Sequence, residues 1–168
     1  MKYIALIALT IVLSSCGTVS YYPQEYEIAN DRIDDFVMKG SVQVINTQTD
    51  STKHTFFAST LDWEGDYKTV TEHLKTQLEK EISENTQKIA SDVNKIIEVK
   101  VVNIKAEQKF FHFSSTMDLE YKLGNSESYT IHVSQGSPGN MWRVLNGTIA
   151  LGVIEILKQA NVIAYLSK

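Results

Sequence analysis

The sequence contains a single cysteine among its 168 residues and no cluster of basic residues. A lone cysteine excludes an internal disulfide, so stability in an oxidising compartment has to come from packing. The formal charge of -4 at pH 7, without a basic patch, argues against electrostatic binding of nucleic acid or of anionic lipid headgroups. With 43% hydrophobic and 21% charged residues, the composition is that of a globular protein, and the length allows one domain.

The chain also lacks the short motifs that would identify a reaction. Its histidines, none of which stands in a two-histidine spacing typical of zinc ligands, are His54, His73, His112 and His132. There is no Gly-x-Ser-x-Gly motif of a serine hydrolase. The turn SQGSPGN at 134–140 lacks the lysine of a phosphate-binding loop. We therefore predict no catalytic residue, no metal site and no cofactor, and we do not expect an enzyme.

The N-terminus has the layout of a secretory signal. Lys2 is followed by an apolar segment from Tyr3 to Leu13 and by two small residues. This segment is shorter than the about 20 apolar residues that a transmembrane helix needs. Residues 1–15 are therefore predicted to be a signal peptide.

The single cysteine lies directly after this signal. The sequence Leu13-Ser14-Ser15-Cys16 resembles the lipobox of bacterial lipoproteins, in which a dedicated peptidase cuts before the cysteine. The resemblance implies that the thiol and the new amine of Cys16 carry acyl chains such as palmitate. Two or more acyl chains give a lasting membrane anchor, whereas one gives marginal binding. The alternative is an ordinary signal peptide whose cleavage region contains a cysteine.

The residue after the cysteine bears on sorting within this lipoprotein class. An aspartate there typically retains such proteins on the inner membrane, and this chain has Gly17 instead. For a cell with two membranes, the resemblance therefore implies an outer-membrane lipoprotein that faces the periplasm. Its membrane partner is the bilayer that holds the acyl chains of Cys16.

Polar residues dominate the segment that follows the predicted anchor. Residues 16–35 show neither a helical nor an alternating apolar pattern, so we predict a flexible tether with a mean span of roughly 25 Å. Aromatic residues are the candidate contacts for a protein partner, because aromatic anchors dominate interfaces. These candidates are Tyr21, Tyr22, Tyr26 and Trp63. The alternative is that the rings pack on the adjacent domain.

A single α+β domain is predicted for residues 36–168. Its first part alternates at Val42 and Val44, passes through a turn-rich stretch, and returns to apolar residues at Phe56 and Phe57. This pattern is typical of two strands joined as a hairpin.

A change of period then indicates a helix. Its apolar stripe, which recurs every four residues, consists of Val70, Leu74, Leu78 and Ile82. Asp66 follows a glycine and can cap the first turn of this helix. Ile89 and Val93 could continue the stripe, so the sequence leaves the end of the helix open.

The clearest strand signal follows. From Phe111 to Leu123 the side chains alternate between an apolar face, which includes Phe113, and a polar face. Upstream, the segment IIEVKVVNI supplies a further strand. Its apolar runs are offset near Val101 and Val102, which indicates a bulge or a fully buried centre.

A return strand, YTIHV, follows the turn GNSES. Because side chains alternate along a strand, a loop with an odd number of residues, most simply three, keeps the apolar sets of both strands on one face. This arithmetic places His132 opposite Asp118 or Glu120 on the polar face. A histidine and carboxylate pair there is expected to contribute about 0.2 to 1 kcal/mol.

The C-terminal region is predicted to form a second helix, with VIAYL as a short final strand. The apolar residues of this helix recur at spacings of three and four, and they are Trp142, Leu145, Ile149, Val153 and Ile156. Such a helix must be largely buried, and Glu155 argues against a membrane span. The predicted fold class is α+β: an antiparallel sheet of about five strands with two helices packed on one face.

From Val42 onward this order of elements is similar to that of the YajG-type small lipoproteins of bacterial outer membranes. That class combines a lipobox with an alternating sheet and an apolar C-terminal helix, which the segment WRVLNGTIALGVIEILKQA resembles. The resemblance concerns element order and implies no known activity.

Two functions are favoured at this point, and a third option is an envelope enzyme whose residues meet only in the fold and leave no trace in the sequence. In the first, a non-catalytic lipoprotein works by contact with an envelope protein complex or with itself. In the second, the domain carries an apolar or amphipathic small molecule between the sheet and the helices. A closed core with an exposed aromatic patch favours contact, whereas a continuous lined cavity favours the carrier. We favour contact, because close packing is the default for protein interiors.

Overall fold

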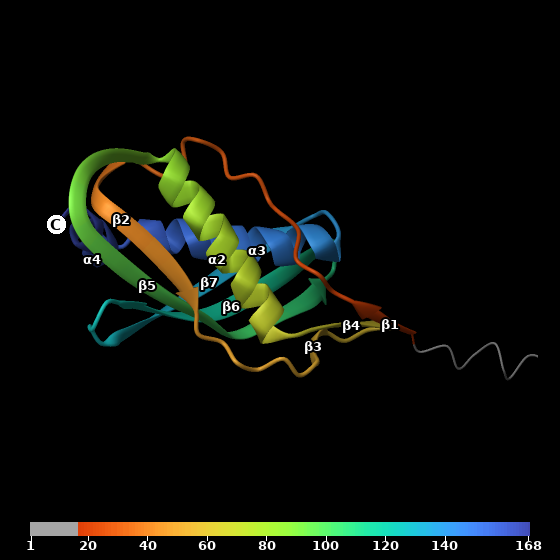
Figure 1. Ribbon diagram of the computed structural model, residues 1–168. Helices are drawn as coiled ribbons and strands as arrows, with labels where there is room; N and C mark the ends of the chain where they lie inside the picture. Colours follow the sequence, from red (N-terminus) through yellow and green to blue (C-terminus); the bar gives the residue numbers. More distant parts are fainter. Residues whose placement is uncertain (1–16) are drawn as a thin grey trace, which may run out of the picture.

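The computed structural model describes residues 17–168. The predicted signal peptide, residues 1–15, and the predicted lipidation site, Cys16, lie outside the described residues. The described chain has a mixed α+β fold with a four-stranded sheet, a three-stranded sheet and three helices (Figure 1). The α+β class predicted from the sequence is therefore confirmed.

The elements alternate between the two sheets at the start of the domain. The strands are β1 (Gly17–Ser20), β2 (Phe36–Asn46), β3 (His54–Phe57), β4 (Leu61–Gly65), β5 (Thr86–Lys109), β6 (His112–Leu123) and β7 (Ser128–Ser137). The helices are α2 (Tyr67–Glu84), α3 (Met141–Leu157) and α4 (Ala160–Ser167). The sequence predicted that β2 and β3 pair as a hairpin, yet they belong to different sheets.

The larger sheet has the strand order β2-β5-β6-β7. β2 runs parallel to β5, whereas β5, β6 and β7 form an antiparallel meander. The register of β5 against β6 shifts between Val101 and Asn103, where the sequence predicted a bulge. The turns of the meander lie at opposite ends of the molecule (Figure 1).

The smaller sheet has the order β1-β4-β3. β1 runs parallel to β4, and β3 runs antiparallel to β4. The prediction of one antiparallel sheet of about five strands is therefore wrong in its detail. Alternation shows that a segment is a strand, but it does not select the strand with which that segment pairs.

Helices α2 and α3 pack on the same face of the larger sheet. α2 buries the four predicted stripe residues, and the carboxylate of Asp66 accepts a 2.7 Å hydrogen bond from the amide of Thr69. α3 is buried along most of its length. A Cβ atom on Gly152 of α3 would lie 2.5 Å from Met117 of β6 and 3.3 Å from Leu74 of α2. The three elements therefore meet at this glycine.

The third helix, α4, was missed by the sequence analysis. Residues 162–166, predicted as a final strand, lie within it, and it buries Val162 and Leu166. A short apolar run fits a strand or a buried helix equally well. Among residues 17–168, no single helix has the length and apolarity needed to cross a membrane. The pair α3 and α4 meets that test only together, with a bend of 61° between them.

Candidate functional site

The segment after the predicted anchor is bound to the domain. Residues 17–20 pair with residues 61–64 as β1 and β4. Tyr21 follows in the core with 1% of its surface exposed, and its Oη donates a 2.6 Å hydrogen bond to Oδ1 of Asn146 in α3. Burial raises the pKa of the Tyr21 hydroxyl. For the described part of the predicted flexible tether (residues 16–35), these contacts show a segment bound to the domain, and they remove Tyr21 from the candidate partner contacts.

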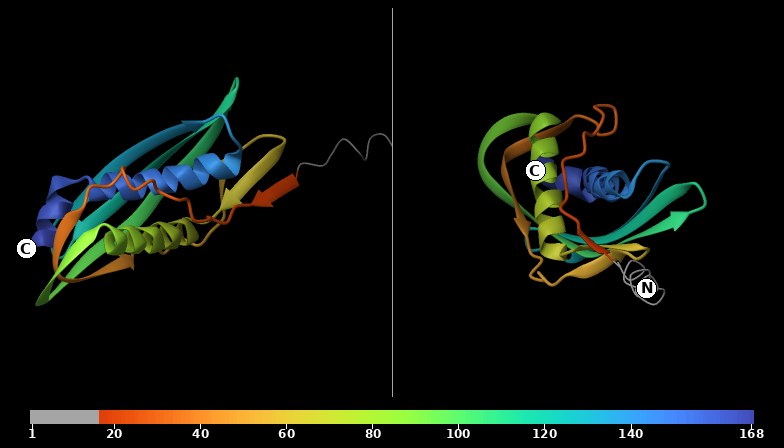
Figure 2. Two further views of the ribbon diagram at one scale, coloured as in Figure 1. Left: turned by 90° about the horizontal axis from the view of Figure 1, so that it is seen from above. Right: turned by 90° about the vertical axis from the view of Figure 1, so that its right-hand side faces the viewer.

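Residues 21–35, here called the strap, cross the outer side of α3 and α2 (Figures 1 and 2). Two side chains of α2 hold the strap. Nε2 of Gln77 donates a 2.6 Å hydrogen bond to the carbonyl oxygen of Tyr26, and Lys80 forms an ion pair with Glu25. The strap therefore has fixed partners on both helices.

The other predicted aromatic contacts differ in their exposure. Tyr22 is 60% exposed, and the ammonium of Lys53 lies 5.2 Å from the centre of its ring. Trp63 is half-buried and packs edge-on against Trp142, with 5.2 Å between the ring centroids. Tyr26 is half-buried in the strap. Tyr22 is thus the member of the predicted set that is free to meet a partner.

Two phenylalanines at the turn between β5 and β6 are far more exposed. Phe110 is 94% and Phe111 86% exposed, and their ring centroids are 5.3 Å apart. Alternation predicted Phe111 on the buried face with Phe113, which is wrong because Phe111 lies beyond the last paired residues, Lys109 and His112. An aromatic pair at the junction of two strand patterns is the signal that could have revealed this turn.

This turn lies at the same end of the molecule as β1 (Figures 1 and 2). Phe113, beside the turn, contacts Phe57 at the end of β3 with 6.1 Å between ring centroids. Gly17 pairs with Leu61, the first residue after the β3–β4 turn. We call this end, formed by the start of β1 and the β3–β4 and β5–β6 turns, the β1 end.

Aliphatic side chains are exposed at the opposite end of the molecule. Ile89 and Val93 of β5 are 48% and 43% exposed, and Val37 of the neighbouring strand β2 is 37% exposed. Residues 86–94 of β5 have β2 as their strand neighbour, because the pairing with β6 begins at Ile97. We call Val37, Ile89 and Val93 the far-end patch. The sequence left Ile89 and Val93 as an extension of a helix, and the structure places them in a strand.

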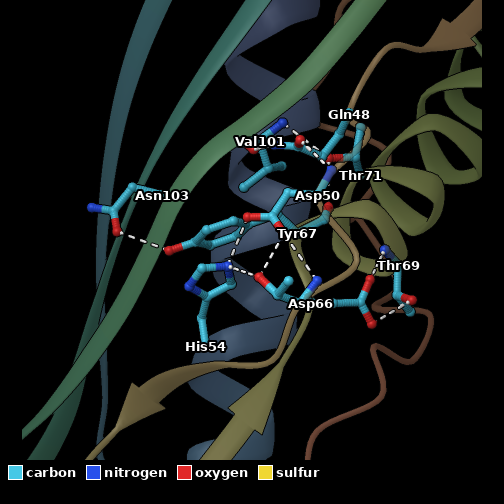
Figure 3. A network of polar contacts seen from close by, with 10 residues as sticks. Gln48, Asp50, His54, Asp66, Tyr67, Thr69, Thr71, Val101 and Asn103 are labelled. Carbon is cyan, nitrogen blue, oxygen red and sulfur yellow. Dashed lines mark hydrogen bonds and ion pairs between the residues drawn. The ribbon is translucent and has the colours of Figure 1, made fainter.

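A polar network orders the loop between β2 and β3 (Figure 3). Nε2 of His54 lies 2.8 Å from Oδ2 of Asp50 and 3.0 Å from the hydroxyl of Thr52, and the His54 ring stacks on Tyr67 at 4.3 Å. Hydrogen bonds from Thr52 and then from His54 lower the pKa of Asp50 to about 2. In a catalytic triad the two ring nitrogens face different groups. Here Nε2 makes both polar contacts of His54, to Asp50 and Thr52, so the histidine holds this loop in its conformation.

The predicted histidine and carboxylate pair is confirmed. Asp118 of β6 lies directly opposite His132 of β7, and Oδ1 of the aspartate is 2.7 Å from Nδ1 of the histidine. This hydrogen bond lowers the pKa of Asp118. Both side chains are on the polar outer face of the sheet. Within residues 17–168, no group of three or more His, Cys, Asp and Glu side chains is arranged to hold a metal ion.

The space between the larger sheet and α3 is filled by side chains. Met117 and Leu119 of β6 and Leu145 and Ile149 of α3 are 0% exposed. A groove of about 550 Å³ lies outside this core, between the strap and α3, and Ile154 is among its lining residues. The structure therefore describes a small α+β domain with a closed core and exposed apolar side chains at both ends.

Comparisons with known proteins bear on the fold. No family model matches the chain, and no curated protein matches its sequence. Among solved structures, the chain is similar to a Xanthomonas campestris protein of the family DUF330, with a TM-score of 0.50 and 13% identity over 89% of this chain and 96% of that chain. It is also similar to an uncharacterized protein, with a TM-score of 0.44 and 8% identity over 89% and 98% of the two chains. The first likeness shows a shared fold alone.

Proposed function

We propose that the protein is a non-catalytic lipoprotein of the bacterial cell envelope that acts by contact with an envelope protein or with a second copy of itself. Acyl chains on Cys16 anchor it to the outer membrane, on the side that faces the periplasm. The observation that carries this proposal is the pairing of Gly17, the residue after the cysteine, in the smaller sheet. A domain joined so closely to its anchor is held at the membrane in a restricted orientation.

The far-end patch supports a contact role. Single exposed aliphatic residues are normal on protein surfaces. Here Ile89 and Val93 lie on a stretch of β5 that has one strand neighbour, and Val37 lies on that neighbour. A strand with an open side and apolar side chains can accept a partner by both main-chain hydrogen bonds and apolar burial. The patch lies at the end away from β1, so an anchored domain presents it to the periplasm.

The alternative function is a carrier of an apolar or amphipathic molecule. A continuous cavity between the sheet and the helices would support a carrier, but side chains fill that space. The specific observation in its favour is the groove between the strap and α3, whose volume of about 550 Å³ lies within the range of ligand sites. A ligand there would contact Ile154 and the strap.

Site-specific photo-crosslinking in native membranes tests the contact role. A photoreactive phenylalanine analogue replaces Ile89 in the full-length chain, and the matched control carries it at Thr130, which is exposed on the polar face of β7. Irradiation is followed by mass spectrometry of the crosslinked protein and of extracted lipids. We expect a crosslink from position 89 to one envelope protein or to a second copy, and none from position 130.

Each other outcome has a defined meaning. Crosslinks of equal yield from both positions would show random collisions and contradict the contact role. Recovery of an uncrosslinked protein with a bound lipid or small molecule, in addition to its own acyl chains, would favour the carrier. Mass spectrometry of the N-terminal peptide tests the anchor itself, because the proposal requires acyl chains on Cys16.

A further inference from the structure

We propose that the β5–β6 turn inserts Phe110 and Phe111 into the lipid bilayer that holds the acyl chains of Cys16. This inference rests on the proposed function, because it requires the lipid anchor. The two phenylalanine side chains are 94% and 86% exposed. Their rings contact each other, with 5.3 Å between centroids. Exposed apolar side chains that are grouped rather than scattered mark sites of contact with a protein or a membrane.

The turn lies at the same end of the molecule as Gly17, the first described residue after the predicted anchor (Figures 1 and 2). Gly17 follows Cys16 directly and pairs with Leu61, whose side chain is 47% exposed and adds apolar surface. Phe113, two residues after Phe111, contacts Phe57 at the end of β3. Figure 1 and the left view of Figure 2 show the β5–β6 turn and the start of β1 toward the same end of the molecule. One bilayer surface can therefore meet both.

A bilayer suits this end better than a protein partner. Acyl chains on Cys16 hold Gly17 at the membrane surface, and the pairing of β1 keeps the turn within reach of the same surface, which raises its effective concentration there. Aromatic side chains favour the boundary between headgroups and acyl chains. The ammonium of Lys109, at the end of β5, lies 2.8 Å from the carboxylate of Glu107, so the inference depends on the aromatic rings and not on a charge.

Insertion of the turn has a consequence for the far-end patch. A lipid anchor alone restrains one point of the domain and leaves it free to rotate about that point. A second contact at Phe110 and Phe111 fixes the orientation of the domain relative to the bilayer. The far-end patch, at the opposite end of the molecule, then points away from the membrane.

Depth-dependent fluorescence quenching tests the insertion. The chain has one cysteine, and acylation would block its thiol, so a new cysteine gives a single labelling position. Full-length lipidated Phe111→Cys carries an environment-sensitive fluorophore and is reconstituted into vesicles of phosphatidylethanolamine and phosphatidylglycerol that contain phosphatidylcholine brominated on its acyl chains. The matched control is Asn125→Cys, which is exposed at the β6–β7 turn at the other end of the molecule.

We expect acyl-chain bromines to quench most of the fluorescence at position 111 and to leave position 125 unquenched. Adding Phe110→Asp to the labelled Phe111→Cys variant should abolish the quenching, which shows that the protein rather than the fluorophore causes insertion. Quenching that persists with Phe110→Asp overturns the inference. Protein that floats with the vesicles but has no quenching at position 111 overturns the inference while the anchor stands. Protein that fails to float contradicts the proposed function and the insertion with it.

Discussion

Tyr21 and Asn146 are joined by a buried 2.6 Å hydrogen bond, although 125 positions separate them in the chain. Oδ1 of Asn146 also accepts a 3.2 Å hydrogen bond from the amide of Gln24. One side chain of α3 thus binds the strap at two points, directly after β1. This contact connects the predicted anchor to the core of the domain.

Loss of the Tyr21 hydroxyl should weaken this connection. We expect Tyr21→Phe to lower the free energy of unfolding by about 0.5–1.5 kcal/mol, the usual contribution of one hydrogen bond. Denaturant unfolding of the full-length protein in mild detergent measures the change. Tyr22→Phe is the matched control, because Tyr22 is 60% exposed and should tolerate the substitution. Equal stability of both variants and the wild type would show that the strap does not depend on this bond.

Gly40 occupies a position that other residues cannot adopt easily. Its φ is 81°, in the left-handed region, and a Cβ atom there would lie 2.1 Å from the carbonyl oxygen of Val93. The register of β2 against β5 shifts at this point. We expect Gly40→Ala to lower the free energy of unfolding by about 1–3 kcal/mol, because backbone strain adds to the clash.

Thermal unfolding followed by circular dichroism measures this effect. Gly136→Ala is the control, since the nearest side-chain atom, on His112, would be 3.6 Å from the new Cβ, which is ordinary contact. A Gly40→Ala variant as stable as this control would contradict the close approach of β2 and β5. Loss of the far-end crosslink in Gly40→Ala is expected too, because Val93 forms part of that patch.

The network at Asp50 should make stability depend on acid pH. Hydrogen bonds from Thr52 and His54 lower its pKa from 3.8 to about 2. A lowered pKa in the folded state stabilises the protein above the unfolded value of 3.8, and this contribution is lost as the pH falls through about 2. We expect the melting temperature of the wild type to fall more steeply in this window than that of Asp50→Asn.

Thr52 supplies the largest part of this pKa shift. The substitution Thr52→Val should therefore reduce the acid dependence without abolishing it, since the contact with His54 stays. Melting curves recorded at several pH values between 3.8 and about 2 separate the three proteins. Identical slopes for the wild type and Asp50→Asn would show that the network does not hold the charged form of Asp50.

Substitution of the predicted lipidation site should remove the lipid anchor without unfolding the domain. We expect Cys16→Ser to stop lipid attachment and cleavage before residue 16 while the domain stays folded, because the described fold begins at Gly17. Metabolic labelling with palmitate, mass spectrometry of the N-terminus and circular dichroism measure these properties. Labelled lipid that still attaches to Cys16→Ser would sink the lipoprotein proposal.

Local patterns predicted α2, α3 and the antiparallel meander. The stripe from Val70 to Ile82 and its cap, Asp66, are contained within one segment, so the periodicity was sufficient to place α2. Alternation and an odd-numbered loop placed His132 opposite Asp118 or Glu120, and the structure shows that the partner is Asp118. In each case the partners are near in sequence, and the geometry of the element itself determines the contact.

These local patterns did not predict contacts between residues that are distant in the sequence. Alternation identified β2 as a strand, but its pairing with β5 depends on which edge the rest of the fold leaves open. Burial of Tyr21 required Asn146 to be brought beside the strap. The exposure of Phe111 depended on where the pairing of β5 with β6 stops.

The sequence by itself determined the α+β class and the two main helices, and it predicts an export signal and a lipobox at Cys16, because each of these depends on residue type and spacing along a continuous segment. Only the tertiary structure decided that the strap is bound rather than free, that two sheets replace one, and that apolar side chains gather at both ends. Those features depend on which surfaces remain unpaired after folding, and that is a property of the whole chain.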